Sequence, residues 1–177
     1  IKAQITVTFI AAKRGLFTAM GAELSGTVLL DDLNLQAAVF DDIGESIAHQ
    51  SLAALLPSLP KRPRYAHKGL YGHVLIIGGN HGMAGAAIMA AEAAARTGAG
   101  LTSVAMQPAY VNAMLARQPE VMAQPVASGQ ELEPLLDKPD VIVIGPGLGQ
   151  TPWSEQLLQK ALATEKPMVL DARSEEH

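Results

Sequence analysis

Apolar runs separated by amphipathic segments dominate the sequence after about residue 70. Four short apolar runs predict strands at 73–77, 101–106, 141–144 and 169–171. Between them, apolar side chains recur at helical spacing, which predicts helices at 84–96, 108–117 and 153–163. Thr151, directly before Pro152, is expected to cap the last helix. Strands that alternate with helices indicate an α/β fold, a parallel sheet with helices on both faces.

The first residues show a different pattern. Ile5, Val7 and Phe9 alternate with two threonines, the period of two that a strand with one buried face shows. A second apolar run at 26–30 predicts another strand, which ends at Asp31. Nothing in this region carries chemistry by itself.

The character of the sequence changes near residue 45. Three prolines and three basic residues fall within 57–64, and proline excludes a helix through most of that stretch. Such a composition is typical of a linker or a domain entrance. We therefore expect two regions, 1–45 and 46–177.

Composition narrows the classes of partner. Only 17% of the 177 residues are charged, against about 25% in a typical domain, so material for a core is ample. The net charge of −4 argues against nucleic acid as a partner. No segment reaches the roughly 18 uninterrupted apolar residues of a membrane helix. The absence of cysteine excludes disulfides and thiolate zinc sites and fits a reducing compartment, so we expect a cytoplasmic protein.

Three features are expected at the carboxyl ends of strands, where open α/β sheets bind ligands. They are the glycine-rich turns 78–85 and 145–149, and Asp171. Glycine lets the backbone approach a phosphate or a sugar, and the helix N-terminus that follows favours an anion. A tight strand-to-helix connection is the alternative for each turn, and a helix cap is the alternative for Asp171. Candidate phosphate or loop contacts within the turns are Asn80, His81, Gly145 and Gly149.

Named nucleotide motifs are absent. The first turn reads Gly79-x-x-Gly82-x-x-Gly85, whereas a dinucleotide fingerprint requires Gly-x-Gly-x-x-Gly. The sequence contains no Gly-Lys-Ser/Thr, and its histidines lack metal-ligand spacing. The residues alone therefore predict a phosphate or nucleotide ligand and no metal site.

Four blocks in order resemble the NAD(P)H-hydrate dehydratase domain, which has a ribokinase-like fold. These blocks are 67–86, 119–122, 145–149 and 169–172. Residues 1–45 are similar to the end of the NAD(P)H-hydrate epimerase domain, through 6–9 and 13–16. Epimerase before dehydratase is the order in bacterial bifunctional repair enzymes. The chain thus resembles a fragment that joins the terminal strands of a Rossmann-like epimerase domain to the first part of a dehydratase domain.

The resemblance implies repair of hydrated nicotinamide cofactors. In this family the epimerase interconverts the R and S hydrates. The dehydratase uses ADP, or ATP in eukaryotes, to phosphorylate the hydroxyl of the S hydrate, and loss of phosphate then restores NAD(P)H. Mg²⁺ is implied with the phosphoryl donor, and K⁺ in the epimerase part. By position, Gly85, Ala86 and Gly147 would line the hydrate pocket, with Asp171 beside the same crevice.

Two departures from the family pattern limit what this piece is expected to do. After Asp171 the family continues with another Asp and an Ala-Leu-Asn run, whereas residues 173–177 read Arg-Ser-Glu-Glu-His, a tail typical of a frameshift or of added residues. The glycine-rich segment with the catalytic Asp and the adenine-nucleotide site is expected beyond residue 177. The catalytic and K⁺-binding residues of the epimerase are expected before Ile1. We therefore expect the parent protein to be a lyase and an isomerase, with no catalytic residue in this piece and no activity of the piece alone.

Two alternatives remain open. One is a nucleotide-binding α/β module without turnover, and the other is a ribokinase-like small-molecule kinase for a sugar or a vitamin. All three interpretations imply a small-molecule partner, without nucleic acid or membrane. A part of a larger sheet also exposes an unpaired edge, so a homo-oligomer is one expected form.

Overall fold

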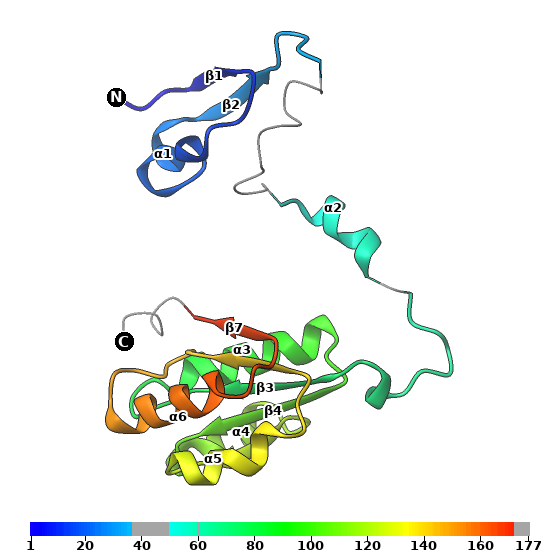
Figure 1. Ribbon diagram of the computed structural model, residues 1–177, viewed down its shortest axis with the longest axis vertical. Coiled ribbons are helices and arrows are strands. Elements are labelled where there is room, and N and C mark those ends of the chain that lie inside the picture. Colours follow the sequence, from blue (N-terminus) through cyan, green and yellow to red (C-terminus); the bar gives the residue numbers. More distant parts are fainter. Residues whose placement is uncertain (37–49, 60, 172–177) are drawn as a thin grey trace. The chain divides into compact units, whose positions relative to one another are not determined.

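A computed structural model describes residues 1–36, 50–59 and 61–171 (Figure 1). The chain divides into two compact units, Ile1–Lys61 and Arg62–His177. The boundary expected near residue 45 and the tail 173–177 lie outside the described residues.

Five strands form one parallel sheet in the unit Arg62–His177 (Figure 1). Their order across the sheet is β5-β4-β3-β6-β7, and every neighbouring pair is parallel. This confirms the predicted α/β class, and the last strand lies one residue earlier than predicted. The strands are β3 (His73–Ile77), β4 (Leu101–Met106), β5 (Met122–Pro125), β6 (Val141–Ile144) and β7 (Met168–Leu170).

Helices cover both faces of this sheet. One face carries α3 (Ala84–Thr97) and α4 (Val111–Arg117), and the other carries α5 (Gly129–Leu136) and α6 (Pro152–Leu162). Thr151 caps α6 as predicted, because its side chain accepts a hydrogen bond from the Ser154 N–H. Short 3₁₀ helices precede β3 and α4, at η4 (Lys68–Leu70) and η5 (Pro108–Tyr110).

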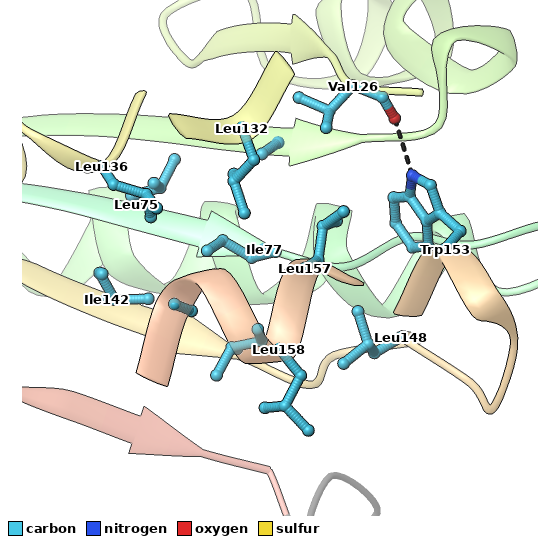
Figure 2. Packing of buried hydrophobic residues seen from close by; sticks show 13 residues of the cluster. Leu75, Ile77, Val126, Leu132, Leu136, Ile142, Leu148, Trp153, Leu157 and Leu158 are labelled. Carbon is cyan, nitrogen blue, oxygen red and sulfur yellow. Dashed lines mark hydrogen bonds between the residues drawn. The ribbon is translucent and has the colours of Figure 1, made fainter. Parts of the chain in front are cut away.

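The alternation of side chains along each strand divides the core into two clusters. Leu75 and Ile77 of β3 enter the cluster under α5 and α6, whereas Ile76 enters the cluster under α3 and α4. Successive side chains of a strand point to opposite faces, so a strand buried on both sides is apolar throughout. Figure 2 shows the first cluster, in which the Trp153 indole donates a hydrogen bond to the Val126 carbonyl at 2.9 Å. Burial of each large side chain contributes about 2 kcal/mol.

In the unit Arg62–His177, the sequence prediction missed one strand and one helix. The strand β5 reads Met-Ala-Gln-Pro, which lacks apolar alternation and ends in a residue that only an edge strand tolerates. The helix α5 contains Pro134. Its N-terminus nevertheless carries a capping signal, because the Ser128 hydroxyl accepts from the Glu131 N–H and the Glu131 carboxylate accepts from the Ala127 N–H.

The connections of β3 and β6 run in opposite directions across the sheet. The chain leaves β3 through α3 toward β4, and it leaves β6 through α6 toward β7, on the other face. β3 and β6 are nevertheless neighbours. Their carboxyl ends therefore form a topological switch point, the place where an open α/β sheet leaves a crevice for a ligand.

The unit Ile1–Lys61 contains a parallel pair of strands, β1 (Ile5–Phe9) and β2 (Thr27–Asp31), joined through η1 (Arg14–Leu16) and α1 (Ala19–Leu24). The alternation in β1 is present, but Thr8 is the buried residue, while Ile5, Val7 and Phe9 are at least half exposed. Among the described residues of this unit, no second layer covers that apolar face. A short helix α2 (Leu52–Leu55) continues into η3 (Leu56–Ser58).

None of the helices in the described ranges has the length and the apolar run that a membrane span requires.

A half-buried histidine should make the stability of the second unit depend on pH. His73 Nε2 lies 2.7 Å from Ser103 Oγ. Burial lowers the pKa of His73, Asp140 opposes this shift, and Lys138 and Lys166 reinforce it. The unfolded chain therefore binds a proton on this side chain more readily than the folded chain does.

We expect the free energy of unfolding to fall as the pH drops below about 6.5, the ordinary pKa of histidine. Urea unfolding followed by the fluorescence of the single tryptophan, Trp153, would measure this effect. The His73→Asn variant keeps a polar partner for Ser103 and should lose less stability than the parent between about pH 7.5 and about pH 5.5. Equal losses in both proteins would contradict the prediction.

Candidate functional site

An open cavity of about 880 Å³ lies at the switch point between β3 and β6. Six residues singled out in the sequence line it together, although they come from three separate segments: Gly85, Ala86, Gly145, Gly147, Gly149 and Asp171. Asn80 and His81 are not among the lining residues. Gly82, Met83 and Leu148 of the same two turns also line it, and Met89 and Gln150, which lie outside those turns, complete the lining.

Backbone hydrogen bonds join the two glycine-rich turns into one floor. Beyond the end of the β3–β6 ladder, the Gly79 N–H donates to the Pro146 carbonyl at 3.0 Å, and the Asn80 N–H donates to the Gly147 carbonyl at 2.8 Å. The pairing of the strands thus continues into the loops. Each turn fixes the position of the other, so the cavity does not depend on either loop alone.

Gly147 occupies a position that requires glycine. Its φ of +63° lies in the left-handed region, and a Cβ there would stand 2.2 Å from the Met83 carbonyl oxygen. The close approach brings the second turn against the start of α3. Gly85 differs, because a Cβ at its position meets nothing within 4 Å and would enter the cavity that Gly85 lines.

The buried side chain of Asn80 ties the first turn to the second. Its exposed fraction is 3%. Its Nδ2 lies 2.9 Å from the Leu148 carbonyl, 2.9 Å from Thr151 Oγ1 and 3.2 Å from Ser154 Oγ, and its Oδ1 accepts from the His81 N–H. Asn80 is thus bonded within the protein, beneath the cavity.

On the outer side of the first turn, Tyr110 supports the loop. Its hydroxyl accepts a hydrogen bond from the Gly82 N–H at 3.0 Å, and its ring meets the His81 ring edge-on at 5.9 Å between centroids. No sequence signal pointed to this role, apart from an aromatic residue two positions after Pro108. The exposed His81 therefore packs beside Tyr110, and the loop is held from both sides.

Backbone amides and one carboxylate supply the polarity of the cavity. The helix α3 begins at Ala84, so its positive N-terminal end and first turn face the cavity that Gly85 and Ala86 line. Asp171 follows the last residue of β7, and its N–H donates to the Ile144 carbonyl at 3.0 Å. It is the one ionisable residue of the described lining. Such a site can hold anionic and hydroxyl groups while the exposed Met83 and Met89 contact an apolar ring.

Within the described ranges, nowhere do three histidine or acidic side chains gather as a metal site would require. We therefore assign no metal-dependent step to these residues.

Known proteins resemble the chain over most of its length. The family model for NAD(P)H-hydrate dehydratase matches residues 74–174. The bifunctional NAD(P)H-hydrate repair enzyme of Coxiella burnetii is 49% identical over 174 residues, which are 98% of this chain and 36% of that protein. The ADP-dependent (S)-NAD(P)H-hydrate dehydratase of Lactiplantibacillus plantarum is 48% identical over 103 residues, 58% of this chain and 37% of that protein. The chain spans about a third of the length of the curated relatives it matches.

Solved structures show the same fold. A ribokinase-like superfamily protein from Enterococcus faecalis covers 72% of this chain and 47% of its own, with a TM-score of 0.61 and 33% identity. The ADP/ATP-dependent NAD(P)H-hydrate dehydratase from Bacillus subtilis, co-crystallised with ATP/Mg²⁺, covers 66% of this chain and 42% of its own, with a TM-score of 0.56 and 30% identity. The fold is ribokinase-like, and the described residues form part of it.

Two glycine-to-alanine variants should change the stability of the unit in opposite directions. Gly147→Ala forces a side chain against the Met83 carbonyl at positive φ and should destabilise the unit by about 2 kcal/mol or more. Gly85→Ala adds a methyl group in open space within a helix and should stabilise it by about 0.5–1 kcal/mol. Urea unfolding followed by Trp153 fluorescence would measure both. An unaltered midpoint for Gly147→Ala would contradict the close approach of the two loops.

Proposed function

The chain belongs to the NAD(P)H-hydrate dehydratase family, and on this basis we propose that it supplies the substrate pocket of an ADP-dependent dehydratase. The reaction would return the S hydrate of NADH or NADPH to the intact dihydronicotinamide. The observation that carries the proposal is the convergence of Gly85, Ala86, Gly147 and Asp171 on one open cavity at the switch point.

The shape and lining of the cavity suit the hydrated nicotinamide end of the cofactor. A volume of about 880 Å³ falls within the range of about 300–1,000 Å³ for small-molecule pockets. The exposed side chains of Met83 and Met89 offer packing for the ring. The N–H groups at the start of α3, such as that of Gly85, have no partner within the helix and offer hydrogen bonds to the carboxamide or to the adjoining sugar and phosphate.

These residues would bind and orient the hydrate, and the phosphoryl donor would be held elsewhere. ADP, or ATP, would transfer its terminal phosphoryl group to the hydroxyl oxygen of the hydrate, which loses its proton. The carbon–oxygen bond then breaks, phosphate leaves, and loss of a proton from the adjacent carbon restores the double bond. Positioning accounts for most of the catalysis in such transfers, so the orientation of that hydroxyl is the contribution of this cavity.

We further propose that the parent protein is bifunctional. Residues 1–45 would form the end of an epimerase domain that interconverts the R and S hydrates, and residues 46–177 would begin the dehydratase domain. The alignment with the Coxiella burnetii repair enzyme over 98% of this chain supports this division. The catalytic Asp, the adenine-nucleotide site with its Mg²⁺, and the K⁺ site of the epimerase would lie outside this sequence, and the piece alone would be inactive.

The test is the recovery of dihydronicotinamide absorbance from purified NADH hydrate in the presence of ADP. We expect recovery with a protein that extends this sequence to the length of its relatives, and none with residues 1–177 alone. A folded full-length protein that binds nucleotide but restores no NADH would contradict the proposal and favour a binding module. Phosphorylation of a sugar or a vitamin instead would favour a ribokinase-like kinase.

A pair of matched substitutions locates the substrate pocket. Ala86→Leu places a larger side chain in the cavity, whereas Ala113→Leu makes the same change at an exposed position of α4. In the full-length protein we expect Ala86→Leu to raise the KM for the hydrate on the order of tenfold or more, with epimerase activity intact. Ala113→Leu should leave both activities unaltered. An unaltered KM in Ala86→Leu would remove this cavity as the hydrate site.

A further inference from the structure

We propose that Asn80 is the positioning residue of the hydrate pocket, which acts by clamping the second glycine-rich turn to the first and to the N-terminus of α6. The inference deepens the proposed function and rests on it. Asn80 does not line the cavity, so its effect on the substrate would pass through the loops that do.

The clamp consists of a closed set of buried hydrogen bonds. Asn80 Nδ2 is within 3.2 Å of three oxygens, those of Leu148, Thr151 and Ser154. The Ser154 hydroxyl itself donates to the Leu148 carbonyl at 2.6 Å, and it lies 2.9 Å from the Thr151 hydroxyl. Ser154 is fully buried. One amide thus connects the first turn, the second turn and the cap of α6.

The clamped residue stands at the centre of the cavity floor. Leu148 lies between Gly147 and Gly149, and all three line the cavity. A Cβ at Gly149 would lie 3.4 Å from Asn80 Nδ2, so the asparagine fills the space directly under that loop. Loss of its side chain removes both the bond to Leu148 and the packing beneath Gly149.

The other end of the side chain orders the entrance of α3. Asn80 Oδ1 accepts from the His81 N–H at 2.8 Å, and the Asn80 carbonyl accepts from the Met83 N–H at 2.9 Å. These bonds shape the four residues that lead into the helix. Asn80 thus contacts both turns that line the cavity, and its side chain supplies the bonds to His81 and Leu148. Removal of that side chain should change affinity for the substrate more than it changes the chemical step.

The test compares three variants in the full-length protein. Asn80→Ala should raise the KM for the S hydrate on the order of tenfold, because a loop shift of about 1 Å would move the bound substrate out of its productive position. The KM for ADP should stay near the parent value. Asn80→Asp should recover only part of the affinity, because a carboxylate cannot donate to the Leu148 carbonyl, which lies 2.9 Å from Asn80 Nδ2. One carboxylate oxygen still accepts from the His81 N–H, the other accepts from the Thr151 hydroxyl, and the nearby helix N-termini favour the charge.

Asn112→Ala is the matched control, because Asn112 is exposed on α4. It should leave all parameters unaltered. If Asn80→Ala lowers only the amount of active enzyme, with the KM for the hydrate unaltered, Asn80 has a merely structural role and the inference is overturned. If Asn80→Asp loses as much affinity as Asn80→Ala, the hydrogen-bonding argument is overturned.

Hydrogen–deuterium exchange tests the clamp independently of turnover. In Asn80→Ala, amides at 81–86 and at 147–150 should exchange faster together, while those of β4 keep the parent rate. Unaltered exchange at 147–150 would overturn the inference even in an active enzyme. If the full-length protein restores no NADH, the proposed function fails, and coupled exchange in both turns would still support the clamp.

Discussion

The pairing of β3 with β6, continued past the strand ends by two backbone hydrogen bonds, is the interaction on which the site depends. Gly79 bonds to Pro146 and Asn80 bonds to Gly147, so two loops more than 60 residues apart in sequence form a single surface. Because the helices after these strands leave toward opposite faces, nothing in the described unit crosses above that surface. The order and direction of the strand connections, more than any side chain, therefore create the cavity.

Polarity in this cavity comes mainly from the main chain. Gly147 and Gly149 lie where the second turn meets Met83 at the start of α3, and a Cβ on Gly147 would stand 2.2 Å from the Met83 carbonyl oxygen. Buried side chains then fix the loops from below, with Asn80 as the connection between them. Such a division fits the proposed phosphoryl transfer, since orientation of the hydroxyl matters more there than acid or base groups.

Strong local patterns made most of the fold predictable. Continuous apolar runs identified β3, β4 and β6, and the capped start at Thr151 identified α6. The edge strand β5 escaped prediction because it lacks that pattern and ends in proline. The alternation in β1 indicated a strand correctly but not which face is buried, because burial depends on the layer that packs against the strand rather than on the strand itself.

The sequence by itself determined the α/β class, the glycine-rich turns and the ordered blocks of the dehydratase family, because each depends on residues that are neighbours in the chain. The family resemblance also implied one pocket for the two turns and Asp171, and the structure brings them to one cavity. Tertiary structure alone decided that Asn80 lies beneath that cavity and that Tyr110 supports the first turn. These placements follow from the order of strands in the sheet. That order depends on packing between helices and strands distant in sequence, which no local pattern encodes.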